Sequence, residues 1–353
     1  MLILQRLFVF ISLLVLSIRV FCGSPENAPS TKAPGSPYTL NNTPWADSVF
    51  NNLTLDERIA QLFMVAAFSN KDRKHEEEIA NLVSKYNIGG IIFFQGTPVK
   101  QASLTNYYQT KAKTPLVIAM DAEWGLGMRL DSTIDFPRQM MLGAVQNPDM
   151  IYEMGENIAW QLRRMGVHIN FAPVVDINNN PDNPVISNRS FGEDRQLVSS
   201  LSMAYMMGLQ NHHIFAVAKH FPGHGDTNSD SHFDLPVINK EFSRIDSIEL
   251  YPFKHLIAGN LGGIMIAHLN IPSLDSTSGL PATLSKKIVT NLLRDSLKFD
   301  GLVFTDALNM KGVTNFFKNG EAEVKALEAG MIFWLCRMIF LLLFRKLSRP
   351  SSP

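Results

Sequence analysis

The feature of this 353-residue chain that most constrains its fold is a regular alternation of short apolar runs and longer helical patterns. Consecutive apolar residues are typical of parallel strands that are covered on both faces. Because helix-like stretches separate the runs, the pattern favours repeated βα units around one parallel sheet. The predicted strands are 61–68, 89–94, 115–121, 169–176, 215–221, 262–269 and 301–308, and the helical patterns include 74–86, 148–165, 195–211 and 285–297.

Polar side chains at the ends of these strands distinguish a barrel from an open sheet. A (β/α)8 barrel builds its active site at the carboxyl ends of its strands, whereas an open doubly wound sheet typically has a Gly-rich first turn. No G-x-G-x-x-G follows the first predicted strand. We therefore expect a TIM-like α/β barrel, although seven predicted strands are one short of a closed one. The strand-end residues are Asp121, Asp176, Lys219, His220, His268 and Asp306.

Charge and cysteine content exclude several classes of protein. The 32 Lys and Arg residues balance 32 Asp and Glu residues, so no global positive field attracts nucleic acid. We therefore expect no nucleic-acid partner. Cys22 and Cys336 lie near opposite ends and lack the spaced companions of a disulfide framework or a zinc site.

The N-terminal residues indicate export. Residues 1–22 place an Arg before an apolar run that is short for a membrane span, as in a signal peptide. Cys22 stands where a bacterial lipobox has its modified cysteine, so attachment to a membrane through a lipid and simple release are both open. The Pro- and Ser-rich residues 23–45 predict a flexible linker, and residues 46–330 predict one folded domain. We expect a periplasmic or outer-surface lipoprotein of a bacterium.

The strongest motif is KHFPGHGDT at residues 219–227, followed by Asp230 and His232. Its Pro and Gly residues predict a mobile loop after a strand. A carboxylate beside an imidazole fixes the tautomer of the ring and stabilises its protonated form, as a general acid/base requires. The alternative is a polar surface loop. A metal cluster of His220, His224 and His232 is disfavoured because the spacings are irregular, and we expect neither metal nor cofactor.

A second motif, FTDALNM at residues 304–310, places Asp306 at the exit of an apolar strand. A carboxylate that points into a barrel mouth could act as the nucleophile of a retaining glycosidase. The alternative is an Asp that caps the following helix.

Together these two motifs resemble glycoside hydrolase family 3, specifically its β-N-acetylglucosaminidase branch, over residues 55–330. The resemblance implies a TIM-like barrel with Asp306 as nucleophile, His232 as acid/base and Asp230 as its partner. It also implies sugar contacts by several strand-end and loop residues, although EWGLGMR at 123–129 has Trp124 where the family usually has Gly. These sugar-binding residues are Asp121, Arg129, Arg189, Lys219 and His220.

The implied substrates are carbohydrates that end in GlcNAc, either muropeptides from peptidoglycan or chitooligosaccharides. Within the family, a β-glucosidase, a xylosidase and a glycosyl phosphorylase are alternatives. In another class, the alternative is an inactive sugar-binding or lipoprotein remnant. The roles of Asp176 and His268 stay open between direct contact with the sugar and support of other residues.

Residues 331–353 depart from the family, which continues with an eighth strand of the form N-D-x-L-x-x-P. Reading the codons of residues 330–339 in a frame shifted by one base permits NDILVMPDD, so we interpret the segment 331–353 as an out-of-frame tail. The alternative is an amphipathic, membrane-associating C-terminus. On the first interpretation, the barrel lacks its last βα unit. Strands one and seven would then be unpaired edges, and the chain would have poor stability and little activity.

Overall fold

A computed structural model describes residues 43–318 and 320–336 of the chain. The expected signal peptide, Cys22 with its lipid and nearly all of the linker lie outside these residues, as does the tail after residue 336. The first helix, α2, begins at Pro44, inside the expected linker, and Pro occupies the position where a helix tolerates it best.

The described residues form one parallel sheet with neighbours in the order β7-β6-β5-β4-β3-β2-β1-β8. Each of the seven predicted strand ranges contains a strand, so these predictions are confirmed, although most strands are shorter than predicted. The strands are β1 Phe63–Phe68, β2 Gly90–Phe94, β3 Val117–Met120, β4 Ile169–Asn170, β5 Phe215–Phe221, β6 Gly263–Ile266, β7 Leu302–Thr305 and β8 Trp334–Cys336.

The expectation of a missing eighth strand is wrong. Residues 334–336 form β8, which pairs in parallel with β1 in the register Met64↔Leu335. The residue before β8 also forms a parallel bridge to the other edge, Phe304↔Phe333. Strand pairing uses backbone groups, so a short apolar segment can fill this position without the expected family sequence. The segment that would supply the helix of the last βα unit lies outside the described residues.

An inner apolar cluster shows that the sheet is curled. Side chains on a strand alternate between its two faces, and the face away from the helices forms a separate cluster. All eight strands contribute to it, which requires their inner faces to converge. The buried members are Met64, Ile92, Ala119, Ile169, Phe171, Phe215, Val217, Met265, Phe304 and Leu335.

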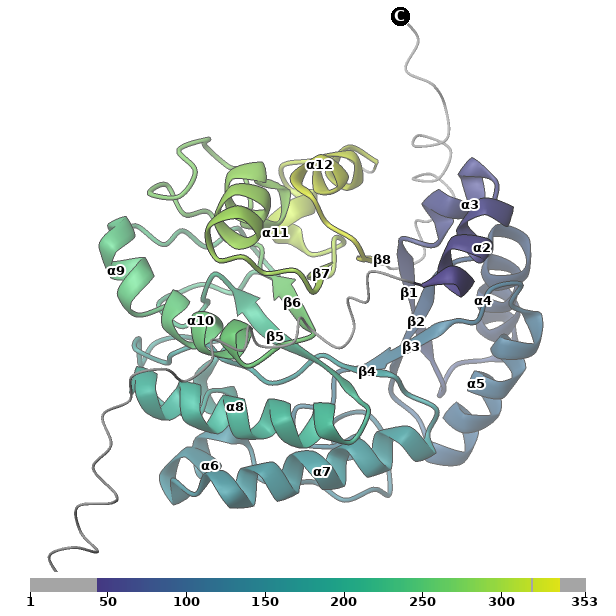
Figure 1. Cartoon of the computed structure of the whole chain (residues 1–353), viewed down its shortest axis with the longest axis horizontal. Helices are drawn as coiled ribbons and strands as arrows, with labels where there is room; N and C mark the ends of the chain where they lie inside the picture. Colours follow the sequence, from purple (N-terminus) through teal and green to yellow (C-terminus); the bar gives the residue numbers. More distant parts are fainter. Residues whose placement is uncertain (1–42, 319, 337–353) are drawn as a thin grey trace, which may run out of the picture. The chain divides into compact units, whose positions relative to one another are not determined.

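The helices lie outside this sheet and cover its outer face (Figure 1). The predicted patterns at 74–86, 148–165 and 195–211 are the helices α4, α7 and α8, and 285–297 contains a π-helical segment, η4. Side chains of Asp72, Asn147 and Asp194 accept hydrogen bonds from the first turns of the three helices. These helices are α4 Arg73–Tyr86, α7 Pro148–Arg164 and α8 Arg195–Asn211, and η4 is Lys287–Ser296.

The remaining helices connect and cap the βα units. The α-helices among them are α2 Pro44–Asn52, α3 Leu55–Ala60, α5 Pro98–Lys111, α6 Gln139–Val145, α9 Phe242–Ser247, α10 Leu250–Ala258, α11 Lys311–Thr314 and α12 Glu321–Ala329. Short 3₁₀ turns are η1 Leu126–Met128, η2 Ser187–Arg189 and η3 Ala282–Leu284.

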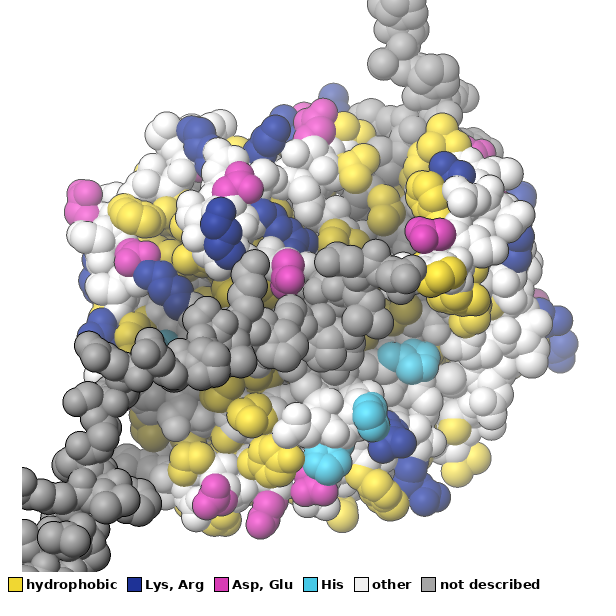
Figure 2. Space-filling model, in the orientation of Figure 1, with side chains coloured by type: hydrophobic (Ala, Val, Ile, Leu, Met, Phe, Trp, Pro, Cys, Tyr) yellow, Lys and Arg dark blue, Asp and Glu magenta, His cyan; other side chains and the backbone are white. Residues whose placement is uncertain are grey.

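Basic and acidic side chains are interspersed on the face of the molecule drawn in Figure 2. This distribution agrees with the equal numbers of both kinds in the sequence. Within residues 43–318 and 320–336, no helix combines the length and the apolar character that crossing a membrane demands.

Candidate active site

A pocket of about 500 Å³ opens at the carboxyl ends of the strands. Its wall includes Phe68 and Phe94, the last residues of β1 and β2, together with Leu335 of β8. Most of the predicted site residues also line it, although they come from distant parts of the sequence. These are Asp121, Arg129, Arg189, Lys219, His220, His232 and Asp306.

Asp121 directly follows β3 and binds two cations. Lys219 Nζ lies 2.8 Å from Asp121 Oδ1, and Arg129 Nη2 lies 2.7 Å from Oδ2. Burial by itself raises the pKa of the Asp121 carboxyl, but the charges of Lys219 and Arg129 outweigh it and hold the pKa below its usual range. Asp121 is therefore an anion that fixes two potential hydrogen-bond donors in the pocket wall.

The Trp that departs from the family motif does not displace this arrangement. Trp124 is half-buried, and Arg138 lies over its ring with Cζ 4.2 Å from the centroid. Arg129 still reaches Asp121 and packs over Phe94, with Cζ 4.7 Å from that centroid. Its Nε is buried without a hydrogen-bond partner in the described structure.

Glu123 is a functional residue that sequence reasoning missed. It is almost fully buried, and the guanidinium of Arg189 donates two hydrogen bonds to its carboxylate. Nη2 lies 2.7 Å from Oε1, and Nε lies 3.0 Å from Oε2. Lys219 Nζ lies 2.7 Å from the same Oε1. Burial by itself raises the pKa of Glu123, but the charges and hydrogen bonds of Arg189 and Lys219 together outweigh it and hold the pKa well below its usual range. The sequence signal that could have identified Glu123 was its position two residues after Asp121, at the start of the motif EWGLGMR.

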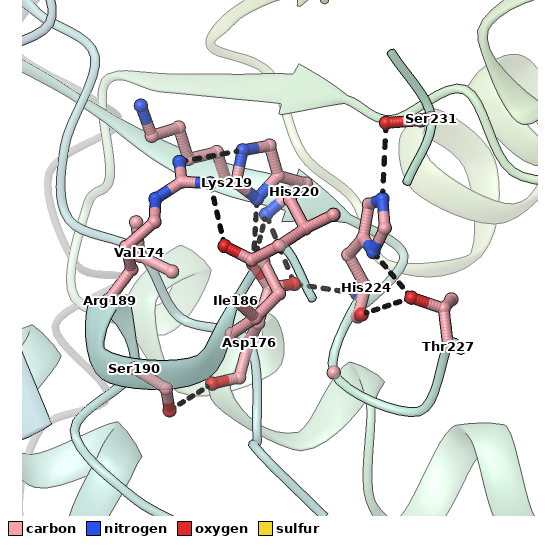
Figure 3. Close-up of polar contacts among 12 residues, drawn as sticks. Val174, Asp176, Ile186, Arg189, Ser190, Lys219, His220, His224, Thr227 and Ser231 are labelled. Carbon is pink, nitrogen blue, oxygen red and sulfur yellow. Dashed lines mark hydrogen bonds and ion pairs between the residues drawn. The ribbon is translucent and has the colours of Figure 1, made fainter. Parts of the chain in front are cut away.

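Asp176 does not line the pocket but contacts His220, which does. Its side chain is inaccessible to solvent, and its Oδ2 lies 2.7 Å from His220 Nδ1. Arg189 Nη2 approaches His220 Nε2 at 3.3 Å, and because a guanidinium can only donate, Nε2 accepts and Nδ1 carries the proton toward Asp176. Figure 3 shows this chain from Arg189 through His220 to Asp176.

His268 is also a supporting residue. It is fully buried, and its Nδ1 lies 2.6 Å from Thr283 Oγ1 while its Nε2 lies 3.1 Å from the carbonyl oxygen of Ala307. Burial is the main reason that the pKa of His268 is lowered. The ring therefore fixes the backbone that immediately follows Asp306.

Asp306 stands directly after β7 on a tightly held backbone. Its own amide donates to the carbonyl of Ile266 in β6, and the amide of Ala307 donates to Asp306 Oδ1 at 2.7 Å. Burial raises the pKa of the Asp306 carboxyl, but His268, His220, the Ala307 amide and Lys219 together lower it below its usual range. Asp306 is therefore ionised at neutral pH.

Asp230 and His232 form a pair on the loop after β5. His232 Nδ1 lies 2.7 Å from Asp230 Oδ1, which also accepts from the His232 backbone amide at 2.8 Å. The His232 side chain is 59% exposed and Asp230 is 25% exposed. His232 lines the pocket, while Asp230 stands behind it and orients its ring. Across the described ranges, no group of three or more His, Cys, Asp or Glu side chains is arranged to hold a metal ion.

The chain is similar to several known proteins. Residues 54–339 match the family described as "Glycosyl hydrolase family 3 N terminal domain". Beta-hexosaminidase A of Pseudoalteromonas piscicida is 37% identical over 277 residues, which are 72% of this chain and 46% of that protein. A beta-hexosaminidase of Nitrosomonas eutropha is 33% identical over 264 residues, 72% of this chain and 73% of the relative.

A solved structure shares the fold. The glycoside hydrolase family 3 β-N-acetylglucosaminidase from Paenibacillus sp. str. FPU-7 superimposes with a TM-score of 0.79 at 36% identity. The superposition covers 84% of this chain and 57% of the Paenibacillus chain. The chain thus spans about half the length of these larger relatives.

Proposed function

Because this chain belongs to glycosyl hydrolase family 3, we propose that it is an exo-β-N-acetylglucosaminidase, which removes terminal non-reducing GlcNAc with retention of configuration. The observation that carries the proposal is the pocket that combines Asp306 with His232 and a charged wall. Relatives named beta-hexosaminidase, at 33–37% identity, support the choice of GlcNAc.

In the first step, Asp306 attacks the anomeric carbon and forms a covalent glycosyl ester, while the bond to the leaving oxygen breaks. Two features support this role: the carboxylate is ionised at neutral pH, and its backbone is fixed between β6 and β8. A fixed anion can attack without reorganising, which lowers the barrier to reaction.

His232 donates its proton to the leaving oxygen in that step. In the second step it takes a proton from water, the water oxygen bonds to the anomeric carbon, and the ester to Asp306 breaks. Asp230 supports both steps because its carboxylate stabilises the protonated ring and keeps Nδ1 engaged, which leaves Nε2 for the substrate. An imidazole here takes the place of the second carboxyl group of most glycosidases.

The charged wall would bind the hydroxyl groups of the sugar. Asp121 accepts from hydroxyls, and Arg129, Arg189, Lys219 and His220 complete the set that orients the ring. Glu123 acts indirectly, since it holds Arg189 and Lys219 in place. The substrates that we propose are muropeptide fragments of peptidoglycan and chitooligosaccharides.

We also infer a closed TIM-like (β/α)8 barrel and export from a bacterial cell. Inner-face contacts from all eight strands support the barrel. Export, and a lipid on Cys22, rest on residues 1–22 alone. Metabolic labelling with a fatty acid would test the lipid, with Cys22→Ser as the matched control.

Hydrolysis of aryl glycosides tests the activity. We expect the chain to release the aryl group from a β-N-acetylglucosaminide much faster than from a β-glucoside, with the β-anomer of GlcNAc as the first product in NMR spectra. Faster turnover of the glucoside, or release that depends on added phosphate, would instead indicate a β-glucosidase or a phosphorylase. Binding of GlcNAc without turnover would indicate a sugar-binding protein.

A further inference from the structure

The loop that carries Asp230 and His232 contains one buried residue between these two more exposed ones. Ser231 is only 2% exposed, whereas the side chain of His232 is 59% exposed. A polar side chain that is buried costs free energy unless hydrogen bonds satisfy it. Ser231 therefore marks the point at which this loop is attached to the body of the protein.

One attachment joins the Ser231 side chain to His224. The Oγ of Ser231 lies 3.3 Å from His224 Nε2, and Figure 3 shows the imidazole between Ser231 and Thr227. His224 Nδ1 lies 2.9 Å from Thr227 Oγ1, and its backbone amide donates to Asp176 Oδ1 at 2.6 Å. The residue that receives Ser231 is thus fixed through its ring by Thr227 and through its backbone by Asp176.

The chemistry of His224 suits this attachment. Burial, reinforced by His220, lowers the pKa of His224 to about 4, so the ring is neutral at neutral pH. A neutral imidazole has one donor and one acceptor nitrogen, and the two hydroxyls of Ser231 and Thr227 satisfy one nitrogen each. The proposed reaction assigns no step to this histidine.

A second attachment joins the Ser231 backbone to the helix after the Asp306 segment. The amide of Gly312, in α11, donates to the carbonyl oxygen of Ser231 at 3.2 Å. A Cβ atom at position 312 would lie 3.0 Å from the carbonyl oxygens of both Ser231 and Asp234. Glycine at this position therefore permits the loop to dock on the segment that carries the nucleophile.

We propose that Ser231 is a positioning residue that anchors the Asp230–His232 pair over the pocket, through its hydroxyl to His224 and its carbonyl to Gly312. The proposal rests on the proposed glycosidase function, because it concerns proton transfer by His232. A general acid must lie within hydrogen-bond distance of the atom that it protonates, so a loosened loop weakens acid catalysis and leaves attack by Asp306 intact.

Substitution Ser231→Ala tests the anchor with two substrates of different leaving group. A dinitrophenyl β-GlcNAc has a leaving group that needs little protonation, whereas the GlcNAc disaccharide needs full protonation. We expect kcat/KM for the disaccharide to fall about tenfold, and for the dinitrophenyl substrate to change less than about twofold, as for partial loss of a general acid. An equal loss on both substrates, or no loss on either, would overturn the proposal.

Ser285→Ala is the matched control. Ser285 is also a fully buried serine, and its hydroxyl donates to Asp275 Oδ2 at 2.6 Å. Neither Ser285 nor Asp275 lines the pocket, whereas Ser231 does. We expect this variant to lower the melting temperature without changing the ratio of kcat/KM between the two substrates. A changed ratio would show that any lost buried hydroxyl has this effect, and would overturn the anchor.

Gly312→Ala tests the second attachment and keeps the proposal falsifiable if Ser231→Ala does not fold. The added methyl group pushes the Ser231 carbonyl away, and we expect the same selective loss on the disaccharide. Hydrogen exchange provides a readout that does not depend on activity. Amides of residues 226–235 should exchange several-fold faster in either variant, with β7 unchanged; equal exchange in variant and wild type would contradict an anchor.

Two reference proteins separate this inference from the proposed function. Wild type must hydrolyse both substrates, and His232→Ala must show a selective loss larger than that of Ser231→Ala. A wild type without activity on either substrate would overturn the proposed function, and hydrogen exchange would then decide the anchor alone. Normal behaviour of both reference proteins, with no selective loss in Ser231→Ala, would overturn only the anchor.

Discussion

The two sides of the pocket are built in opposite ways. Asp306 lies on a backbone that is hydrogen-bonded to β6, and the flanking Thr305 amide donates to Phe333, just before β8. His232, which also lines the pocket, is itself exposed and stands on a loop whose contacts to the body of the protein include those of Ser231. The difference fits the chemistry: a nucleophile attacks from one place, while an acid/base must serve a departing sugar and then an entering water.

The largest expected loss of activity follows from replacing Asp306. Asp306→Ala removes the only nucleophile of the proposed reaction, so we expect kcat/KM to fall by about 10⁴ or more on every leaving group. The measurement is hydrolysis of aryl β-N-acetylglucosaminides. Asp295→Ala, an exposed aspartate on η4, is the control and should keep wild-type activity. Near-normal turnover by Asp306→Ala would remove the nucleophile from the scheme.

On the loop side, His232→Ala should lower kcat/KM in proportion to the need for protonation. We expect a loss of about 10²–10³ on the GlcNAc disaccharide and a much smaller loss on a dinitrophenyl substrate. Asp230→Ala should follow the same pattern more weakly, because Asp230 orients the ring and stabilises its protonated form but does not itself transfer the proton. Equal losses on both substrates would contradict the assignment of His232 as the general acid.

The support of Asp306 by the C-terminal segment can be tested by truncation. Leu335 donates its amide to Thr305 Oγ1, and its carbonyl accepts from Leu308, so removing residues 331–353 releases both sides of Asp306. We expect the melting temperature to fall by about 10 °C and activity to fall on all leaving groups alike. A chain that ends at Cys336 should keep most of its stability. Equal behaviour of the two truncated chains would refute a role for β8.

The smallest effect concerns stability in mild acid. The pKa of His224 falls from an ordinary value near 6.5 to about 4 in the folded protein, so between these pH values the unfolded chain binds the proton and the folded protein does not. Stability is therefore lost as pH falls through this window, by about 2 kcal/mol between pH 6.5 and 5.

His224→Gln measures this contribution. The variant starts less stable at pH 7, but its melting temperature should fall less between pH 7 and pH 5 than that of wild type. His75, His168 and His268, whose pKa values are also lowered, act equally in both proteins. The lowered pKa of Asp306 stabilises the fold at neutral pH, and this contribution is lost only when pH falls below the ordinary pKa of a carboxyl group, so the effects of His224 and Asp306 occur in different pH ranges. An identical fall in variant and wild type would contradict the burial of His224.

Much of the fold was predictable because it depends on short-range patterns. Consecutive apolar residues identified seven strands, and the periodic patterns between them identified α4, α7, α8 and η4. β8 was missed because residues 331–336 lack the expected family motif. Strand pairing requires only free backbone groups and apolar side chains on the inner face. Leu335 meets this requirement, because it is buried in the inner cluster with residues of the other strands.

Site residues that belong to a local motif were predictable from the sequence, whereas residues whose role depends on distant partners were not. Asp121 and Asp306 stand at strand ends, which the apolar runs reveal. The importance of Glu123 depends on Arg189, 66 residues away, and on Lys219 in another strand. Nothing in the local sequence distinguishes a carboxylate that binds two buried cations from one that faces solvent.

By itself, the sequence determined the parallel strands, the strand-end carboxylates and the Asp230–His232 pair, because each follows from residue types at short spacing. Only the tertiary structure decided which groups meet: Asp176 under His220, Glu123 between Arg189 and Lys219, and Ser231 between His224 and Gly312. The physical reason is that these contacts depend on how the sheet curls, and curling brings together residues whose separation along the chain carries no signal.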